Sequence, residues 1–271
     1  MRYNLPTITL GRTGLVITRL GIGGAYCETP EGYRAALDCG VNYLDTARAY
    51  RDGQDEQVVG EAIKDRRKGI ILATKTATRD AKGAQQDLEK SLRLLQTDYI
   101  DIWQIHYVNK EEELERTLGP GGALETAIKA REKGHVRFIG ITGHKWSILH
   151  QALATGTFDT VLCWYNCAMR EAEELVFPEA QRCHTGVVIM NASRNDKLFD
   201  GLNAPPEADF YRYVLGHPAV HATLVGLRDI NRFRRIAAAL ATNCTLPEAS
   251  RRVLESYGAW MRASGKLDIE E

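Results

Sequence analysis

The chain has 271 residues, 44% of them hydrophobic, and its 35 Lys and Arg residues balance 35 Asp and Glu residues. A formal net charge of zero excludes a globally basic protein that binds nucleic acid or an anionic membrane through charge alone. The first residues do not resemble a signal peptide, and no apolar run reaches the roughly 18 residues of a membrane span. The six cysteines include no C-x-x-C pair, which favours ordinary reduced cysteines over a zinc or iron–sulfur site. We therefore expect a cytoplasmic protein with neither a membrane nor a nucleic-acid partner.

Residues 8–18 open the chain with a predicted β-hairpin, whose turn lies at Gly11–Gly14. Eight short apolar runs then follow, and a helix-like amphipathic segment comes after each of them. The second run ends at Asp45 and the eighth at Val225, which are 180 residues and six units apart, so one unit averages 30 residues. The apolar runs cover residues 19–24, 41–46, 69–75, 99–106, 136–142, 160–166, 186–191 and 221–226. The helical segments begin at Thr29-Pro30 and continue with 54–67, 84–96, 123–134, 144–156, 171–183, 209–216 and 229–241.

This alternation predicts the fold class. Hydrophobic strands that alternate with amphipathic helices form a parallel sheet covered on both faces, and eight units close into an α/β fold of the (β/α)8 TIM barrel type. Residues 246–264 predict an additional C-terminal helix with Val253, Tyr257 and Trp260 or Met261 on one face. We expect residues 1–271 to form a single barrel domain.

A dinucleotide-binding open sheet is the alternative architecture. The stretch GIGGAY (21–26) follows a strand, and Asp45 comes about twenty residues later, as in the glycine-rich fingerprint of that fold. However, Tyr26 occupies the third glycine position, and the next helix begins only at Thr29-Pro30. The glycines would not lie at the helix N-terminus, where a pyrophosphate is bound. We therefore favour the barrel.

Polar residues gather at the predicted carboxyl ends of three successive strands, where barrel active sites lie. Asp45 ends the second strand and Tyr50 follows it, Lys75 ends the third, and His106 ends the fourth. Each residue alone is more often structural, but their coincidence on one rim indicates a site. A nearby ammonium lowers the pKa of a phenol, a carboxylate holds the ammonium, and an imidazole orients a carbonyl. Such a set protonates an oxygen that gains negative charge, and it requires a separate hydride-donating cofactor.

The chain resembles the aldo-keto reductase family from about residue 7 to residue 242. VNYLDTARAY (41–50) resembles the family's Asp-Thr-Ala segment with a tyrosine five residues after the aspartate, and ILATK (71–75) carries the lysine. SLRLLQTDYIDIWQIH (91–106) resembles the stretch that ends in the histidine and is the most specific match; GHVRFIGIT, FDTVLCWYN and YRYVLGHPAVHATLVG continue the pattern. The resemblance implies that Tyr50 is the general acid, that Lys75 lowers its pKa, that Asp45 pairs with Lys75 and that His106 orients the carbonyl. NADPH would supply the hydride.

Arginines crowd the start of the helix that follows the eighth strand: Arg228, Arg232, Arg234 and Arg235. Cations are unfavourable at a helix N-terminus, so a bound anion would account for them. By the resemblance, Arg232 falls on the family's arginine for the adenosine 2′-phosphate, which favours NADPH over NADH. We expect Gly226, Arg228 and Arg235 to belong to the same cofactor site.

The nicotinamide end of the expected cofactor site departs from the family pattern. Where the family commonly has Ser-Asn after the fifth strand, this chain has Thr142-Gly143-His144, so we expect the Thr142 hydroxyl and His144 to hold the carboxamide. Leu162 replaces a usual glutamine, and we expect Asn191 to contact the ring region.

The substrate is expected to be a small-molecule aldehyde or ketone, with Tyr26 as an apolar or aromatic wall and Tyr107, Trp103 and Trp164 as further candidates. The leading hypothesis is NADPH-dependent reduction of carbonyls to alcohols by a monomer or small homo-oligomer. One alternative is a non-catalytic barrel that binds a nicotinamide nucleotide or senses redox state. The changed residues at the expected carboxamide site keep this alternative open. Another is a lyase or isomerase that uses the Tyr/Lys pair as a base.

Overall fold

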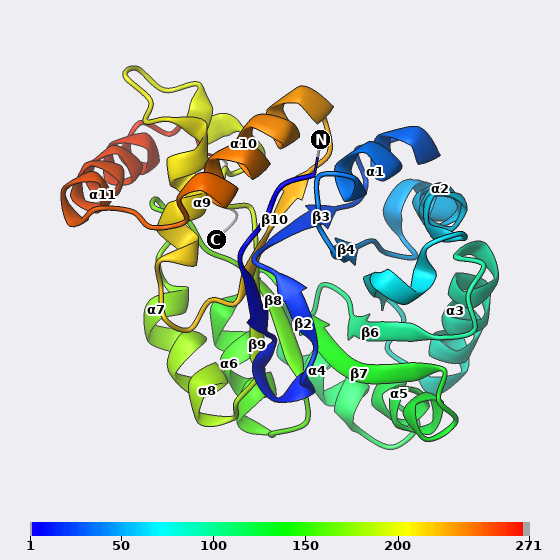
Figure 1. Ribbon diagram of the computed structural model, residues 1–271. Helices are drawn as coiled ribbons and strands as arrows, with labels where there is room; N and C mark the ends of the chain where they lie inside the picture. The colour runs from blue at the N-terminus through cyan, green and yellow to red at the C-terminus, as the bar shows by residue number, and fades with distance from the viewer. Residues whose placement is uncertain (1, 268–271) are drawn as a thin grey trace.

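A closed barrel of eight parallel strands forms the centre of the molecule in the computed structural model, which describes residues 2–267 (Figure 1). The last strand pairs with the first, with Thr223 opposite Leu20 and Gly226 opposite Gly23, so the sheet has no free edge. This confirms the (β/α)8 prediction and excludes the open dinucleotide-binding sheet. The strands are β3 (Leu20–Gly23), β4 (Tyr43–Asp45), β5 (Ile71–Thr76), β6 (Ile100–Ile105), β7 (Val136–Thr142), β8 (Thr160–Trp164), β9 (Gly186–Met190) and β10 (Ala222–Gly226).

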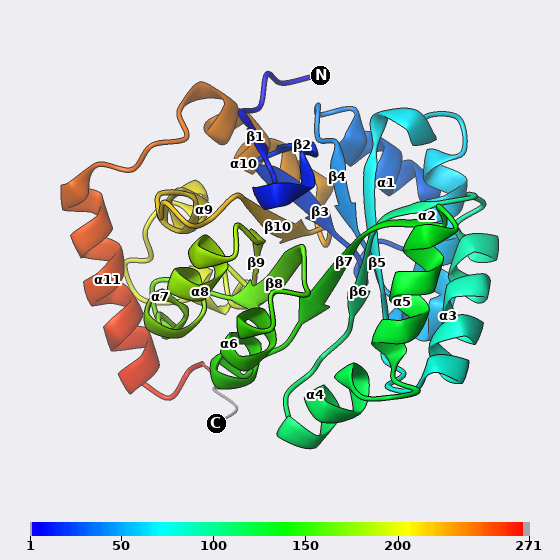
Figure 2. The same ribbon diagram turned by 90° about the horizontal axis from the view of Figure 1, so that it is seen from below.

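Helices surround the barrel, and several begin with the side-chain caps that their sequences predict (Figure 2). Thr29 accepts a hydrogen bond from the Gly32 amide and Pro30 fills the first turn of α1, while Asp80 and Asp229 cap α3 and α10 in the same manner. The main helices are α1 (Pro30–Leu37), α2 (Gln54–Ile63), α3 (Ala81–Leu94), α4 (Glu111–Leu118), α5 (Ala123–Glu132), α6 (Trp146–Ala154), α9 (Glu207–Leu215), α10 (Ile230–Thr242) and α11 (Glu248–Ala263). Among residues 2–267, no helix has the length and apolar character needed to cross a bilayer.

The segment 171–183 differs from the single helix predicted for it. It forms two short helices, α7 (Ala172–Leu175) and α8 (Phe177–Arg182), which meet at Val176. Pro178 lies in the first turn of α8, where its missing amide is tolerated. The same ring would remove a hydrogen bond from the interior of a continuous helix, and this explains the break.

The predicted N-terminal hairpin closes the amino-terminal end of the barrel. Strands β1 (Thr7–Thr9) and β2 (Val16–Thr18) are antiparallel, and a short 3-10 turn, η1 (Gly11–Thr13), joins them. Leu10, Leu15 and Ile17 pack against barrel-lining residues such as Ile102 and Val188. Gly11 has φ +47°, and a Cβ there would lie 2.3 Å from the Gly186 amide nitrogen, so this close approach requires glycine.

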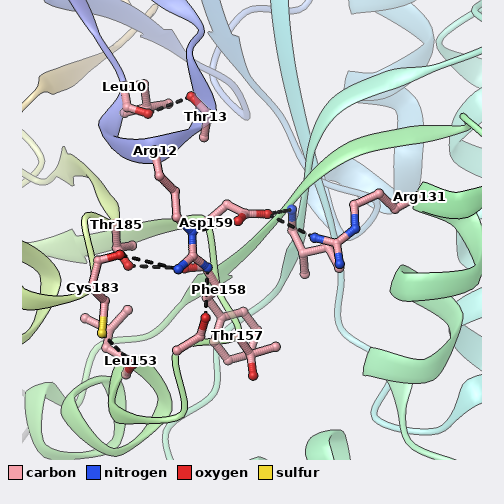
Figure 3. Close-up of polar contacts among 12 residues, drawn as sticks. Leu10, Arg12, Thr13, Arg131, Leu153, Thr157, Phe158, Asp159, Cys183 and Thr185 are labelled. Carbon is pink, nitrogen blue, oxygen red and sulfur yellow. Dashed lines mark hydrogen bonds and ion pairs between the residues drawn. The ribbon is translucent and has the colours of Figure 1, made fainter.

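Asp159 connects the hairpin to the barrel at this end. Its Oδ1 accepts a 2.9 Å hydrogen bond from Arg12 Nε, and its Oδ2 accepts one of 3.0 Å from the Ile139 amide. Arg12 and Arg131 approach the carboxylate from different directions (Figure 3). The backbone of Asp159 also accepts a hydrogen bond from the Gly186 amide. The carboxylate of Asp159 therefore connects the η1 turn to β7, and the backbone of the same residue connects to β9.

The C-terminal helix α11 forms as predicted, but its buried face was assigned incorrectly in part. Leu254, Tyr257 and Met261 are buried, whereas Val253 is 59% exposed and Trp260 is 43% exposed. The helix lies on the outer side of the barrel beside α9 (Figures 1 and 2). Residues 268–271 lie outside the described part of the chain.

Candidate active site

A cavity of about 330 Å³ opens at the carboxyl ends of the barrel strands. This is the end opposite the hairpin, where barrel active sites are found. The four residues predicted as the catalytic set, Asp45, Tyr50, Lys75 and His106, all line the cavity.

Lys75 is the centre of this set. It lies on β5 beside β4, is 1% exposed, and forms an ion pair with Asp45 Oδ1. Its Nζ also donates to the Thr46 carbonyl at 2.6 Å and to Tyr50 Oη at 3.3 Å. An ammonium has three donors, so all three are used. Because Tyr50 Oη is the acceptor, the phenolic proton remains available for a ligand in the cavity.

Gln104 is a part of the site that sequence reasoning missed. Its Nε2 donates a 2.7 Å hydrogen bond to Asp45 Oδ2, and the side chain is 1% exposed. Gln104 and His106 are two positions apart in the chain, and alternation along a strand places such residues on the same face. That spacing was the available signal. Gln104 fixes the carboxylate oxygen that Lys75 leaves free.

The turn that positions Tyr50 is rigidly held. It forms a 3-10 segment, η2 (Tyr50–Gly53), in which Arg51 and Asp52 have left-handed φ angles of 51° and 54°. Gly53 has φ 87°, and a Cβ there would lie 1.8 Å from an Arg48 guanidinium nitrogen. Left-handed non-glycine residues persist only where their surroundings impose them. We attribute the precise placement of the phenol to this turn.

Two buried carboxylates support the turn from behind. Glu56 accepts hydrogen bonds from Arg48 Nη1 at 2.6 Å and from Thr74 Oγ1 at 2.7 Å. Asp55 accepts hydrogen bonds from Thr46 Oγ1 at 2.6 Å and from the Tyr33 hydroxyl at 2.7 Å. Both carboxylates are fully buried, and buried carboxylates are stable only when they are paired or hydrogen-bonded in this way.

Lys75 lowers the pKa of Tyr50, as the sequence-based expectation has it, but it does not set the net pKa. Burial raises the pKa of Tyr50, and the opposing effect of the Lys75 charge is smaller, so the net pKa lies above its ordinary value. For Lys75, burial lowers the pKa, but Asp45 and Tyr50 outweigh it and leave the net pKa raised. Lys75 therefore limits the rise of the Tyr50 pKa without reversing it. The phenol keeps its proton and the ammonium keeps its charge at neutral pH.

His106 follows β6, and its ring meets the Tyr50 ring edge to face, with centroids 5.7 Å apart. Its amide donates to the Thr76 carbonyl at 2.8 Å, which fixes the backbone. Burial, aided by the charge of Lys75, lowers the pKa of His106 to about 3. The imidazole is therefore neutral, with one nitrogen able to donate a hydrogen bond to a ligand oxygen.

The residues expected at the nicotinamide end meet on one wall of the cavity. The His144 ring stacks on Trp164 at 3.9 Å and meets Tyr107 edge to face. His144 Nδ1 has no hydrogen-bond partner among the described residues, and burial lowers the His144 pKa to about 4. Thr142 Oγ1 accepts a hydrogen bond from the Tyr107 amide at 2.9 Å and keeps its own proton free to donate. A neutral imidazole and a hydroxyl can together hold a carboxamide.

The structure also accounts for both departures from the family pattern near this wall. A Cβ at Gly143 would lie 2.4 Å from the Val108 carbonyl oxygen, so no side chain fits there. Leu162 is 2% exposed and packs with the residues that fill the barrel interior. Asn191 lines the cavity with φ 62°, and its carbonyl accepts a hydrogen bond from Asn166 Nδ2 at 2.9 Å.

Tyr26 lies against the residues expected for the cofactor. Its ring is 3.9 Å from the Arg228 guanidinium, and it covers Gly226, where a Cβ would lie 2.7 Å from the ring. Its hydroxyl donates to Asn195 Oδ1 at 3.1 Å. Trp103, named as a candidate for the substrate wall, is fully buried in the core and is not among the residues that line the cavity. Tyr26 therefore bridges the β3 and β10 loops to the loop that follows β9.

The predicted phosphate-binding arginine is already paired with acids. Arg232 Nη1 forms a 2.7 Å hydrogen bond with Asp196 Oδ2, and its Nε lies 3.0 Å from Glu207 Oε1 without the alignment of a hydrogen bond. Arg235, 60% exposed, lies 3.3 Å from Glu207 Oε2. Sequence reasoning missed both carboxylates because they lie 36 and 25 positions before Arg232, between the seventh apolar run and the next predicted helix.

The chain is a closed (β/α)8 barrel with Tyr, Lys, Asp and His at the carboxyl ends of its strands, where the active sites of this fold lie. The family model described as "Aldo/keto reductase family" matches residues 26–194. The chain belongs to the aldo/keto reductase family.

Individual relatives show the same relationship. Aldo-keto reductase YhdN of Bacillus subtilis is 35% identical over 196 residues, which cover 64% of this chain and 57% of that protein. L-galactose dehydrogenase of Arabidopsis thaliana is 27% identical over 202 residues, covering 66% and 62%. The chain thus matches less than two thirds of the length of these curated relatives.

Solved structures show the same fold over nearly the whole chain. Aldo-keto reductase AKR11C1 from Bacillus halodurans, in its holo form, superposes with a TM-score of 0.82 at 24% identity, covering 94% of this chain and 96% of that one. An aldo/keto reductase from Klebsiella pneumoniae, solved with NADP and acetate, gives a TM-score of 0.78 at 24% identity and the same coverage.

Proposed function

We propose that this protein reduces small aldehydes or ketones to alcohols, with NADPH as the hydride donor and Tyr50 as the general acid. The observation that carries the proposal is the direction of the hydrogen bonds around Lys75. The ammonium donates to Tyr50 Oη, so the phenolic proton is directed to another acceptor, and Tyr50 lines the cavity.

The residues fit a nicotinamide cofactor. His144 Nδ1 and the buried Trp164 Nε1 lack partners among the described residues, and both side chains line the cavity. Gly226 lets the Tyr26 ring pack against the backbone of the cavity wall, and Arg228 supplies a positive charge there. NADPH, when bound, supplies a hydride to the carbonyl carbon. Membership of a family that includes a structure solved with NADP supports this choice of cofactor.

In the proposed reaction, the neutral His106 donates a hydrogen bond to the carbonyl oxygen and fixes its position beside Tyr50. As the carbonyl carbon accepts the hydride, the carbon–oxygen π bond breaks and its electron pair moves to the oxygen. That oxygen takes the proton from Tyr50 Oη, and the alcohol results. The positive charge of Lys75 stabilises the phenolate until solvent returns the proton. Asp45 and Gln104 hold Lys75 in place throughout.

The test is the variant Tyr50→Phe, which keeps the ring and removes the acid. We expect kcat for aldehyde reduction to fall by about 10²–10⁴-fold because general acid catalysis contributes that much. The dissociation constant for NADPH, followed by quenching of tryptophan fluorescence, should stay within about twofold. Tyr107→Phe removes a hydroxyl from a neighbouring phenol and serves as the matched control.

Full activity in Tyr50→Phe would show that another group is the acid. Binding of the cofactor by the wild-type protein without turnover of a broad panel of aldehydes and ketones would favour the non-catalytic nucleotide-binding alternative. Failure of the wild-type protein to bind either NADPH or NADH would contradict the proposed function altogether.

A further inference from the structure

Arg232 contacts Asp196, a residue that lines the cavity, and its surroundings bear on how the cofactor is selected. The inference rests on the proposed function, because it concerns the adenosine end of the proposed cofactor site. NADPH differs from NADH only by a phosphate on the 2′-oxygen of the adenosine ribose. Selection between them therefore depends on the charges that this phosphate meets.

Two carboxylates meet the Arg232 guanidinium. Asp196 bonds to Nη1 at 2.7 Å, and Glu207 lies 3.0 Å from Nε. The three side chains are similarly exposed, at 31% for Arg232, 28% for Asp196 and 29% for Glu207. Asp196 itself lines the cavity, whereas Arg232 is not among the lining residues. A ligand in the cavity therefore meets the anion before it meets the cation.

The carboxylate of Asp196 is held in this position by Ser193 and Arg232. Its Oδ1 accepts a hydrogen bond from Ser193 Oγ at 3.1 Å, and the Asp196 amide donates to Ser193 Oγ at 3.3 Å. The preceding residue, Asn195, is bonded to the Tyr26 hydroxyl. Glu207 is fixed between Arg232 and Arg235. A phosphate can reach Arg232 only by displacing a carboxylate or by sharing the cation with it.

We propose that Asp196 and Glu207 are specificity-determining residues that remove most of the preference for NADPH, so that the protein uses NADH nearly as well. A 2′-phosphate would lose affinity through repulsion by these two anions. The 2′-hydroxyl of NADH instead can donate a hydrogen bond to Asp196, in the manner by which carboxylates select the unphosphorylated ribose in another fold. The pyrophosphate is common to both cofactors, so Arg228 contributes equally to each.

The experiment compares the dissociation constants of NADPH and NADH by tryptophan quenching, in the wild-type protein and in two variants. We expect the wild-type constants to lie within about tenfold of each other. Asp196→Asn and Glu207→Gln should each tighten NADPH by about five- to twentyfold and change NADH by less than about twofold. Asp209→Asn is the matched control, because Asp209 pairs with Arg212 at 2.7 Å with similar exposure.

A coupling measurement makes the test sharper. Arg232→Gln should weaken NADPH only slightly in the wild-type background and more strongly in the Asp196→Asn background, because only the second removes the anion that occupies Arg232 Nη1. The inference is wrong if the wild-type protein prefers NADPH by more than about a hundredfold, or if the variants change both cofactors alike. These outcomes leave the proposed function standing, whereas absence of binding by either cofactor would remove both.

Discussion

At the scale of single residues, the site balances a buried positive charge with one buried negative charge. Lys75 and Asp45 are each 1% exposed, and a buried ion pair persists only when its remaining hydrogen-bonding positions are satisfied. Thr46 and Tyr50 accept from Lys75, and Gln104 donates to Asp45. Because His106 is neutral as well, the mouth offers a carbonyl compound hydrogen-bond donors without a net charge beside them.

The pKa shifts at this site predict a flat pH profile. We expect kcat for reduction to stay constant from about pH 5 to pH 9. His106, with a pKa of about 3, has no proton to lose in this range. Burial raises the pKa of Tyr50 above its ordinary value of 10.0, so the acid is lost only when the pH rises beyond that value. The measurement is kcat at saturating substrate and cofactor across this range.

His106→Gln provides the control for this profile, since an amide keeps a donor and does not titrate. The kcat of this variant should be lower than that of the wild-type protein, and its pH profile should be equally flat. The expectation is wrong if kcat of the wild-type protein changes between about pH 6 and pH 7 and this change disappears in His106→Gln. Such a result would show that the histidine titrates near its unperturbed pKa.

The sequence could predict that Asp45, Tyr50, Lys75 and His106 gather at one rim because each ends or follows a recognisable apolar run, and the barrel brings the ends of those runs together. It could not identify Asp196 or Glu207, because their contact with Arg232 depends on the path of a loop. The sequence could predict that Lys75 lowers the pKa of Tyr50, but not that the net pKa is raised, since the extent of burial that raises it is a property of the packed structure.

At the scale of elements, helix α11 supports the loop that carries Asp196. The Tyr257 hydroxyl donates a 2.8 Å hydrogen bond to the Leu198 carbonyl, and both groups are buried. A Cβ at Gly201 would lie 2.0 Å from the same hydroxyl oxygen, so helix and loop are in close contact. The helical period alone could not fix which face of α11 is buried, because Val253 and Leu254 are adjacent apolar residues and only Leu254 faces the protein.

Tyr257→Phe tests this support. We expect the free energy of unfolding to fall by about 1 kcal/mol, because one buried hydrogen bond is lost and the Leu198 carbonyl is left without its donor. Denaturant unfolding measures the change, and hydrogen exchange should rise selectively in residues 198–204. Val253→Ala, on the exposed face of the same helix, should alter neither quantity measurably. Uniform exchange changes across the chain would argue against a local role.

At the scale of the whole molecule, the two ends of the barrel have different tasks. The carboxyl end carries the candidate site, and the amino-terminal end carries Asp159 with Arg12 and Arg131. The eight-stranded barrel was predictable because its hydrophobic repeat extends over the entire chain. The contact between the hairpin and β7 through Asp159 could not be predicted from the sequence, because it joins residues that are 147 positions apart.

Asp159→Ala should separate stability from activity. We expect the free energy of unfolding to fall by about 2–3 kcal/mol, since the Ile139 amide and Arg12 lose a partly buried charged partner. At temperatures where the variant is folded, kcat and KM should equal the wild-type values. Asp65→Asn is the control, because Asp65 is 77% exposed and lies 3.9 Å from Arg34, an ion pair of little energetic weight. A change in KM for Asp159→Ala would mean that the two ends are coupled.

The hairpin at the floor of the barrel also has a consequence for the order of events at the mouth. Since Leu10, Leu15 and Ile17 fill the amino-terminal end, the cavity is reached from the carboxyl side. Ligands that share one opening leave in the reverse order of their entry. In the proposed reaction, a dinucleotide that reaches from Lys75 toward Asp196 would enter before the small carbonyl compound and leave after the alcohol. This order predicts a sequential mechanism in which release of the cofactor is the final step.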